Sequence, residues 1–208
     1  MIRGKFSALV LLAAITALSS CRGSKSETNP APGEYKVRLQ TSKGDVLILV
    51  HRDWSPFGAD RFYELTKLGF YDGNRLFRVL RGFIVQWGLT GDPKLNGDWS
   101  KRTIKDDPPK VSNKIGTVVF ATAGPNSRTT QVFINLGDNS SSLDPQGFTP
   151  FGEVIQGMDT VTSFYADYGD GPPSGTGPDQ ESIAAFGNSY LEEHFPKLDY
   201  IKTARVVP

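Results

Sequence analysis

The sequence predicts a mainly β domain that closes into an eight-stranded antiparallel barrel, accompanied by two or three helices. Short stretches of alternating apolar residues recur along the chain after residue 35, and loops rich in Gly, Pro, Asn and Asp separate them. Helical spacing of apolar residues occurs in only a few places. Because the edge strands of an open sheet expose unpaired backbone groups, about eight strands in one domain favour closure into a barrel.

The first 20 residues are predicted to be a signal peptide. Arg3 and Lys5 precede an apolar run at 7–18, which is too short to span a bilayer. The motif LSSC that follows resembles the lipobox of bacterial lipoproteins, and its Cys21 is the only cysteine in the chain. We therefore expect Cys21 to carry lipid and the protein to be exported and membrane-anchored, with its domain outside the cytoplasm. The alternative is an ordinary cleaved signal in which this cysteine falls by chance.

Residues 21–34 are predicted to be the lipidated cysteine and a flexible tether, and residues 35–208 to be the domain. The tether segment is polar, rich in Ser and Pro, and has no periodic apolar face. From residue 35 onward the alternation of apolar and polar residues begins. This change of composition places the domain boundary.

The predicted domain starts with a β-hairpin at residues 35–51. Apolar and polar residues alternate on both sides of a Lys-Gly turn, which is the pattern of two strands with one buried face. A helix is predicted next, with Ser55 as its N-cap, Pro56 at its first position and Gly69 as its stop signal.

The rest of the domain alternates strands with loops. The six remaining strands are predicted at residues 76–79, 83–87, 117–122, 131–135, 151–154 and 200–207. A second short helix is predicted at 158–165 and a third at 183–195, where a Gly-Asn pair interrupts the pattern. Residues 168–181 are rich in Gly and Pro and predict a long surface loop.

The composition argues against several classes of function. The formal net charge is only +1 and is spread along the chain, so we expect no surface for nucleic acid. His51 and His194 are the only histidines, which leaves too few ligands for a zinc site and few candidate bases for a Ser-His-Asp triad. We therefore expect neither a metal nor a cofactor.

Two polar residues interrupt the predicted strand pair at 76–87. Arg78 and Gln86 each lie between two apolar neighbours. Because successive side chains of a strand point to opposite faces, both could simply face water. They could instead face a shared groove that carries chemistry, and the strand pattern alone leaves the two interpretations open.

Three runs of the sequence bear on this question: FRVLRGFIVQWG at 77–88, ATAGPNSRTTQVFI at 121–134 and SLDPQGFTPFGEVIQGMDTV at 142–161. In this order and at this spacing they resemble the hallmark runs of the cyclophilin-type peptidyl-prolyl isomerases, over about residues 35–207. The resemblance implies a cyclophilin-like barrel and an enzyme that rotates Xaa-Pro bonds. Its partners would be proline-containing polypeptides, and we expect it to be a monomer.

Carried over by position, the resemblance implies that Arg78 is the catalytic arginine. It implies a substrate-binding groove on the outer surface of the barrel, lined by Phe83, Ile84, Gln86, Ala121, Thr122, Ala123, Gln131, Phe133, Leu143 and Phe148. The sequence departs from the family where Ser142 stands for a frequent tryptophan. A one-residue insertion also leaves Gly147 or Phe148 at the position of a pocket histidine, and Phe148 is the better candidate to close an apolar pocket.

Two functions fit the resemblance. The first is a tethered isomerase that assists the folding of exported proteins, in which proline isomerisation can limit the rate. The second is a non-catalytic module that grips proline-containing peptides at the membrane. The presence of Arg78 favours the enzyme, while the long inserts at 89–114 and 169–196 keep the binding module open.

Overall fold

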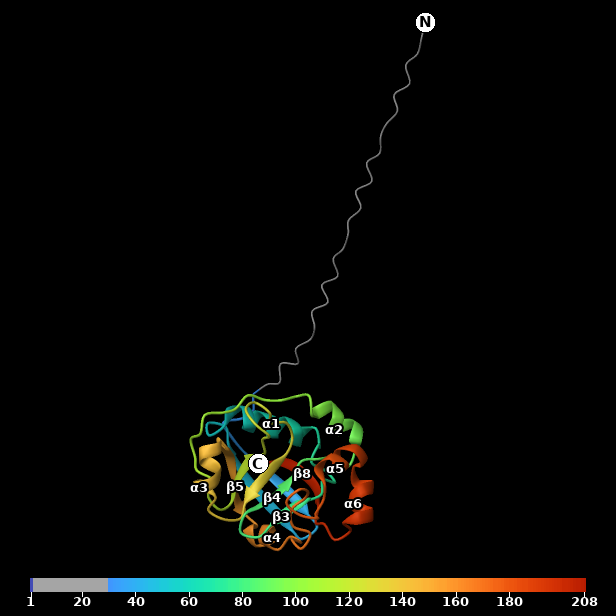
Figure 1. Ribbon diagram of the computed structural model, residues 1–208. Helices are drawn as coiled ribbons and strands as arrows, with labels where there is room; N and C mark the ends of the chain where they lie inside the picture. Colours follow the sequence, from blue (N-terminus) through green and yellow to red (C-terminus); the bar gives the residue numbers. More distant parts are fainter. Residues whose placement is uncertain (2–29) are drawn as a thin grey trace.

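One antiparallel sheet of eight strands forms the centre of the domain in the computed structural model, which describes Met1 and residues 30–208. The predicted signal peptide, Cys21 and most of the predicted tether lie outside the described residues. The strands are β1 (Glu34–Thr41), β2 (Asp45–His51), β3 (Arg78–Leu80), β4 (Ile84–Trp87), β5 (Thr117–Phe120), β6 (Val132–Asn135), β7 (Pro150–Gln156) and β8 (Ile201–Val207). Their order across the sheet is β3-β4-β6-β5-β7-β2-β1-β8 (Figure 1). All eight predicted strands are confirmed, with ends that shift by a few residues.

The prediction of a closed barrel is wrong, because the sheet curls into a half-barrel with two ends. Within the described residues, β3 pairs only with β4, and β8 pairs only with β1. The chain before β3 meets the chain around the start of β8 through an isolated bridge between Arg75 and Tyr200 and a few backbone hydrogen bonds between residues 73–76 and 199–201, but no ladder of paired strands forms there. With only three residues, β3 is too short to form a ladder with β8. Short edge strands are one way in which open sheets avoid edge-to-edge aggregation, so closure is not required.

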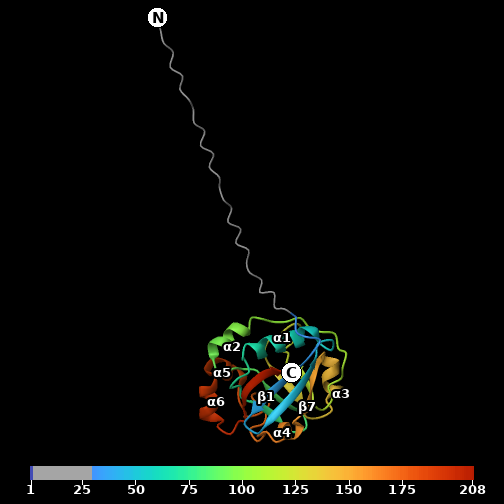
Figure 2. The same ribbon diagram turned by 180° about the vertical axis from the view of Figure 1, so that it is seen from behind.

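The main hydrophobic core lies inside the curl of the sheet. The buried positions of β1 and β2 alternate as the hairpin pattern predicts, with Val37, Ile48 and Val50 fully buried. Helix α1 (Pro56–Lys67) covers one end of the sheet, where its Phe62 packs on Phe151 with ring centroids 4.9 Å apart. Helix α4 (Met158–Thr162) lies at the opposite end (Figures 1 and 2).

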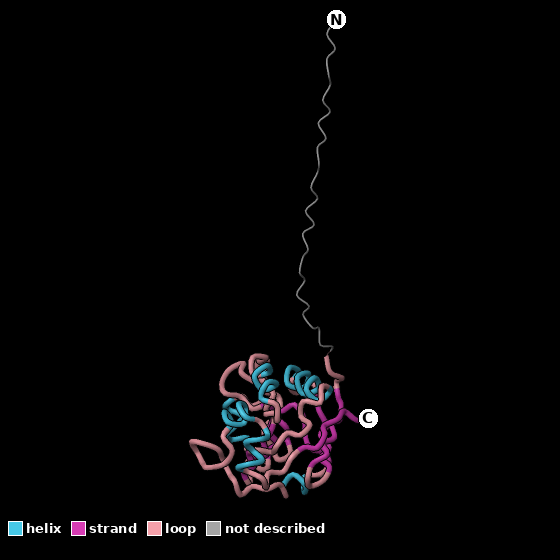
Figure 3. Tube along the Cα trace, turned by 90° about the vertical axis from the view of Figure 1, so that its right-hand side faces the viewer, coloured by secondary structure: helices cyan, strands magenta, loops and turns pink. Residues whose placement is uncertain are grey.

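The described residues contain six α-helices rather than the two or three predicted. The unpredicted ones are α2 (Pro93–Trp99) and α3 (Ser140–Leu143), which continues into a 3-10 turn (Asp144–Gln146). Such short helices contain at most two turns, so the sequence carries little helical periodicity to detect. The third predicted helix is divided at Gly187 into α5 (Gln180–Phe186) and α6 (Asn188–His194). In the view of Figure 3 the helices lie above, to the left of and below the strands, which form the right-hand side of the domain.

The C-terminal insert forms a second, smaller core on the outside of the sheet. Ile183 of α5 and Leu191 of α6 pack against Phe77, which immediately precedes β3. Helix α5 also contacts α2, so the two inserts lie side by side (Figures 1 and 2). Residues 165–200 are thereby attached next to the strand that carries Arg78.

Candidate active site

A groove with a volume of about 670 Å³ runs along the outer face of the sheet, and it brings together every residue that the sequence predicts for the site. Its lining includes all eleven of them: Arg78, Phe83, Ile84, Gln86, Ala121, Thr122, Ala123, Gln131, Phe133, Leu143 and Phe148. The site residues come from the β3–β4 hairpin, from β6 and the residue before it, from the loop that follows β5, and from α3 and the segment after it. The groove also has walls that the sequence did not predict, from Ser100, Ser127, Thr129, Gln146, Asp170, Gly171, Pro172, Ser174 and Gln180.

The apolar floor of the groove follows from the alternation of side chains in three neighbouring strands. On β6, Val132 and Ile134 point into the main core, whereas Phe133 points outward with Ile84 of β4. Leu143 and Val119 complete this outer cluster. Phe148 packs edge-on against Phe133, with ring centroids 5.8 Å apart. The cluster forms a small apolar pocket that is separate from the main core.

A chain of hydrogen bonds crosses the floor beside this pocket. Arg78 and Gln86 are direct partners in the β3–β4 ladder. The Arg78 Nη1 donates to Gln86 Oε1 at 3.1 Å, and Gln86 Nε2 donates to Gln131 Oε1 at 2.8 Å. Because a guanidinium can only donate, it fixes the orientation of the Gln86 amide. The guanidinium carbon also lies 5.8 Å from the centre of the Phe83 ring.

Asp170, which was not predicted from the sequence, binds the side of the Arg78 guanidinium that carries Nε and Nη2. Its carboxylate accepts from Nε at 2.7 Å and from Nη2 at 3.0 Å. These bonds from Arg78 lower the pKa of the Asp170 carboxyl, so it is ionised at neutral pH. Residues 168–179 form a surface loop, as predicted, but the sequence did not predict that this loop folds onto the groove at Asp170.

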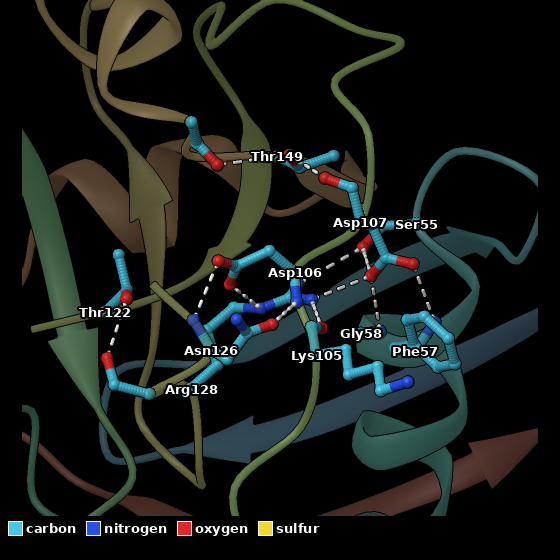
Figure 4. A network of polar contacts seen from close by, with 12 residues as sticks. Ser55, Phe57, Gly58, Lys105, Asp106, Asp107, Thr122, Asn126, Arg128 and Thr149 are labelled. Atoms are coloured by element: carbon cyan, nitrogen blue, oxygen red, sulfur yellow. Dashed lines mark hydrogen bonds and ion pairs between the residues drawn. The ribbon is translucent and has the colours of Figure 1, made fainter. Parts of the chain in front are cut away.

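The peptide-facing edge at Thr122 is shaped by local hydrogen bonds and by a buried network behind it. The Thr122 and Ser127 hydroxyls are 2.9 Å apart, and both bond to the Gly124 carbonyl. Behind this turn, the Asn126 and Asp106 side chains each accept from the other residue's backbone N–H, at 3.0 and 2.8 Å (Figure 4).

Arg128 and Asp107 form the centre of that network. Both residues are 5% exposed, and Arg128 Nη2 donates to Asp107 Oδ2 at 3.0 Å. The same carboxylate accepts from the Ser55 hydroxyl and from two backbone N–H groups at the start of α1 (Figure 4). Ser55 is the N-cap residue of α1, as predicted, but its own side chain makes no capping hydrogen bond. The Asp107 carboxylate accepts from the helix N–H groups instead.

Comparison with known proteins identifies the family to which this chain belongs. The family model for cyclophilin type peptidyl-prolyl cis-trans isomerase/CLD matches residues 36–178. This chain belongs to the cyclophilin family. This cyclophilin is 31% identical over 173 residues to peptidyl-prolyl cis-trans isomerase B of Escherichia coli, a match that covers 79% of this chain and 94% of the relative. It is 35% identical over 127 residues to peptidyl-prolyl cis-trans isomerase ppi1 of Schizosaccharomyces pombe, covering 59% and 79%.

Solved structures share the fold of this cyclophilin. A crystal structure of a Cryptosporidium parvum cyclophilin type peptidyl-prolyl cis-trans isomerase has a TM-score of 0.60 at 20% identity and covers 84% of this chain and 98% of its own. A second crystal structure of that protein, in the presence of the dipeptide Ala-Pro, has a TM-score of 0.58 at 20% identity and covers 83% and 99%. The predicted resemblance to the family is thus confirmed, while the roles of the individual site residues stay predictions.

Proposed function

We propose that this cyclophilin is a peptidyl-prolyl cis-trans isomerase that rotates Xaa-Pro bonds in exported proteins and thereby assists their folding. One observation carries the proposal. Hydrogen bonds to Asp170 and Gln86 hold the Arg78 guanidinium at the edge of an apolar pocket on the outer face of the sheet. The names of the curated relatives support the same reaction.

The chemistry of the reaction explains why this pair of features suits it. Rotation about an Xaa-Pro bond breaks amide resonance, with a barrier of roughly 18–20 kcal/mol. In the twisted state the lone pair of the proline nitrogen is localised, so a donor aimed at it binds that state better than either planar isomer. Arg78 supplies such a donor, and the Phe133 pocket would hold the pyrrolidine ring. Backbone groups near Thr122 would hold the flanking peptide.

These groups can supply the lowering of the isomerisation barrier that catalysis requires. Shortening a process of about 10–100 s to milliseconds requires about 5.5–7 kcal/mol, at 1.36 kcal/mol for each factor of ten. A charge-assisted hydrogen bond in a partly dehydrated groove contributes about 1.5–3 kcal/mol even to ordinary stability. Restriction of the peptide in the groove adds to this in the same direction.

Exchange NMR on an Ala-Pro peptide, with and without the protein, tests the proposal. We expect the protein to accelerate exchange between the cis and trans signals at catalytic concentration. A protein that shifts the peptide signals on binding, but leaves their exchange rate unchanged, would instead be the non-catalytic binding module.

We also propose that the protein is exported and anchored to a membrane through lipid on Cys21, and that it acts as a monomer. The lipobox-like motif before Cys21 supports the anchor. Among residues 30–208, no helix has the length and hydropathy of a membrane span.

Cys21→Ser is expected to move the protein from the membrane fraction to the soluble fraction. A single acyl chain binds membranes only marginally, so firm anchoring depends on the several chains that a bacterial lipoprotein carries. Cell fractionation followed by immunoblotting measures the shift, with Ser24→Ala in the tether as the control that stays in the membrane. Wild-type protein already in the soluble fraction would contradict lipidation.

A further inference from the structure

The Arg78 guanidinium is held by three hydrogen bonds to two partners, which leaves two of its N–H groups for a ligand. Nε and Nη2 donate to Asp170, and Nη1 donates to Gln86. A guanidinium has five N–H donors. The two that these bonds do not use, one on Nη1 and one on Nη2, make no other hydrogen bond to a described residue. A peptide in the groove can therefore receive a donor from Arg78 without breaking the ion pair.

The segment that carries Asp170 is built as a compact turn, held by its own backbone. Gly177 donates its N–H to the Asp170 carbonyl at 2.8 Å, and Gly175 donates to the Gly171 carbonyl at 3.0 Å. A side chain at Gly175 or Gly177 would collide with the Asp170 carbonyl, so the close approach requires glycine. The Gly171 N–H also donates to the Asp170 carboxylate at 2.9 Å, which fixes its rotamer.

Hydrophobic packing attaches this turn to the strand that carries Arg78. Tyr168, just before the turn, packs into the second core with Ile183 and Leu191. Phe77 belongs to the same core and directly precedes Arg78 in the chain. The carboxylate and the guanidinium are therefore held by one packed unit, although they lie 92 residues apart in sequence. Such a fixed arrangement preorganises a donor, which is how an active site gains from a supporting group.

The turn borders the groove without filling the apolar pocket. Pro172 and Ser174 line the groove, but neither belongs to the cluster of Ile84, Phe133 and Leu143 that forms the pocket floor. The cavity of about 670 Å³ remains open beside the turn. The Arg78 and Asp170 side chains keep only 22% and 28% of their exposure, so water screens their pairing less than that of a surface pair.

We propose that Asp170 is a positioning residue for Arg78, and that the insert at 169–196 serves to present it. This inference rests on the proposed isomerase function. The carboxylate holds the guanidinium fork side-on, so that the two remaining N–H groups point at the proline of a bound peptide. A bidentate carboxylate gives a guanidinium one orientation, whereas the single bond to Gln86 would leave it free to rotate.

Asp170→Ala in the full-length protein is expected to lower kcat about fivefold and to change KM by less than about twofold. The effect should fall mainly on kcat because the transition state depends on the orientation of Arg78 more than the bound ground state does. Asp170→Glu should recover part of the loss. The matched control is Asp167→Ala, which removes a carboxylate just before this insert from an exposed pair with Arg81 at 3.5 Å. The control should keep the wild-type kcat.

A double-mutant cycle separates positioning from a structural effect. In the Arg78→Ala background, Asp170→Ala should cause no further loss, because Asp170 acts only through that side chain. The NMR signal of the Arg78 Nε–H should lose its protection from exchange in Asp170→Ala. If the alanine variant unfolds the insert, Asp170→Asn takes its place, since the amide oxygen can still accept from the Gly171 N–H.

Four results would overturn the proposal. Unchanged kcat in Asp170→Ala would show that the pair is not used, and increased kcat would show that it restrains Arg78. A loss of equal size in the Arg78→Ala background would show that the insert acts through folding alone. A wild-type protein without isomerase activity would overturn the proposed function as well, and the Nε–H signal would then still report whether Asp170 orients Arg78.

Discussion

Arg78→Ala is expected to leave the domain folded and to lower the isomerisation rate at least about tenfold, the equivalent of 1.36 kcal/mol. Arg78 lies on an edge strand and points into the groove rather than into the main core, so its removal leaves no cavity in that core. The Asp170 carboxylate that loses its partner is 28% exposed and stays hydrated. The loss should therefore appear in the rate and not in the fold.

Arg81→Ala is the matched control. Arg81 lies in the turn between β3 and β4, its side chain is 70% exposed, and it pairs only with Asp167 among the described residues. Exchange NMR on the Ala-Pro peptide measures both variants, and circular dichroism confirms their fold. Arg78→Lys should also stay impaired, because an ammonium keeps the charge but loses the planar fork. A folded Arg78→Ala variant with full activity would remove Arg78 from the proposed role.

The groove could be predicted from the sequence because its residues lie in contiguous runs. Arg78, Phe83 and Gln86 fall within one hairpin, while Phe133 lies in the next strand along the groove and Gln131 directly precedes that strand. Once a run is assigned to a strand, the alternation of side chains decides which residues share a face. The resemblance of these runs to the family then supplied the roles that alternation cannot give.

Closure of the sheet and the contacts of the inserts could not be predicted in the same way. The number of strands does not determine whether β3 and β8 pair, because that depends on how far the short strand β3 extends. Asp170 and Asp107 lie in segments with no regular pattern, and each meets its arginine only after the chain has folded. An acidic residue in a Gly- and Pro-rich segment looks the same in the sequence whether it faces water or a buried guanidinium.

Asp107→Ala is expected to lower the free energy of unfolding by about 3–5 kcal/mol, because it removes the buried carboxylate that pairs with the buried Arg128 guanidinium. The loss is a large part of the roughly 5–15 kcal/mol that stabilises an ordinary domain. Asp107 also accepts from the backbone of Phe57 and Gly58 at the start of α1, at 3.0 Å each. Removal of the helix cap adds to the cost of the unpaired charge.

Urea denaturation measures the change, with Asp106→Ala as the matched control. Asp106 also faces Arg128, at 3.4 Å, but its side chain is 41% exposed and it caps no helix. Its replacement should cost about 1 kcal/mol or less, apart from the loss of its bond to the Asn126 N–H. A double variant with Asp107→Leu and Arg128→Met tests the cause directly, since replacing a buried pair by apolar residues of similar volume is often neutral.

If the unpaired charge is the cause, that double variant will be more stable than Asp107→Ala although it lacks both charged groups. It will still lack the helix cap, so it should remain below the wild type by about 1 kcal/mol. A double variant as unstable as Asp107→Ala would show instead that the cap and the bonds of Arg128 to the chain, rather than the ion pair, hold the 100–114 loop against α1. In either case the turn at Thr122, which precedes Arg128, loses its support, and weaker peptide binding should accompany the loss of stability.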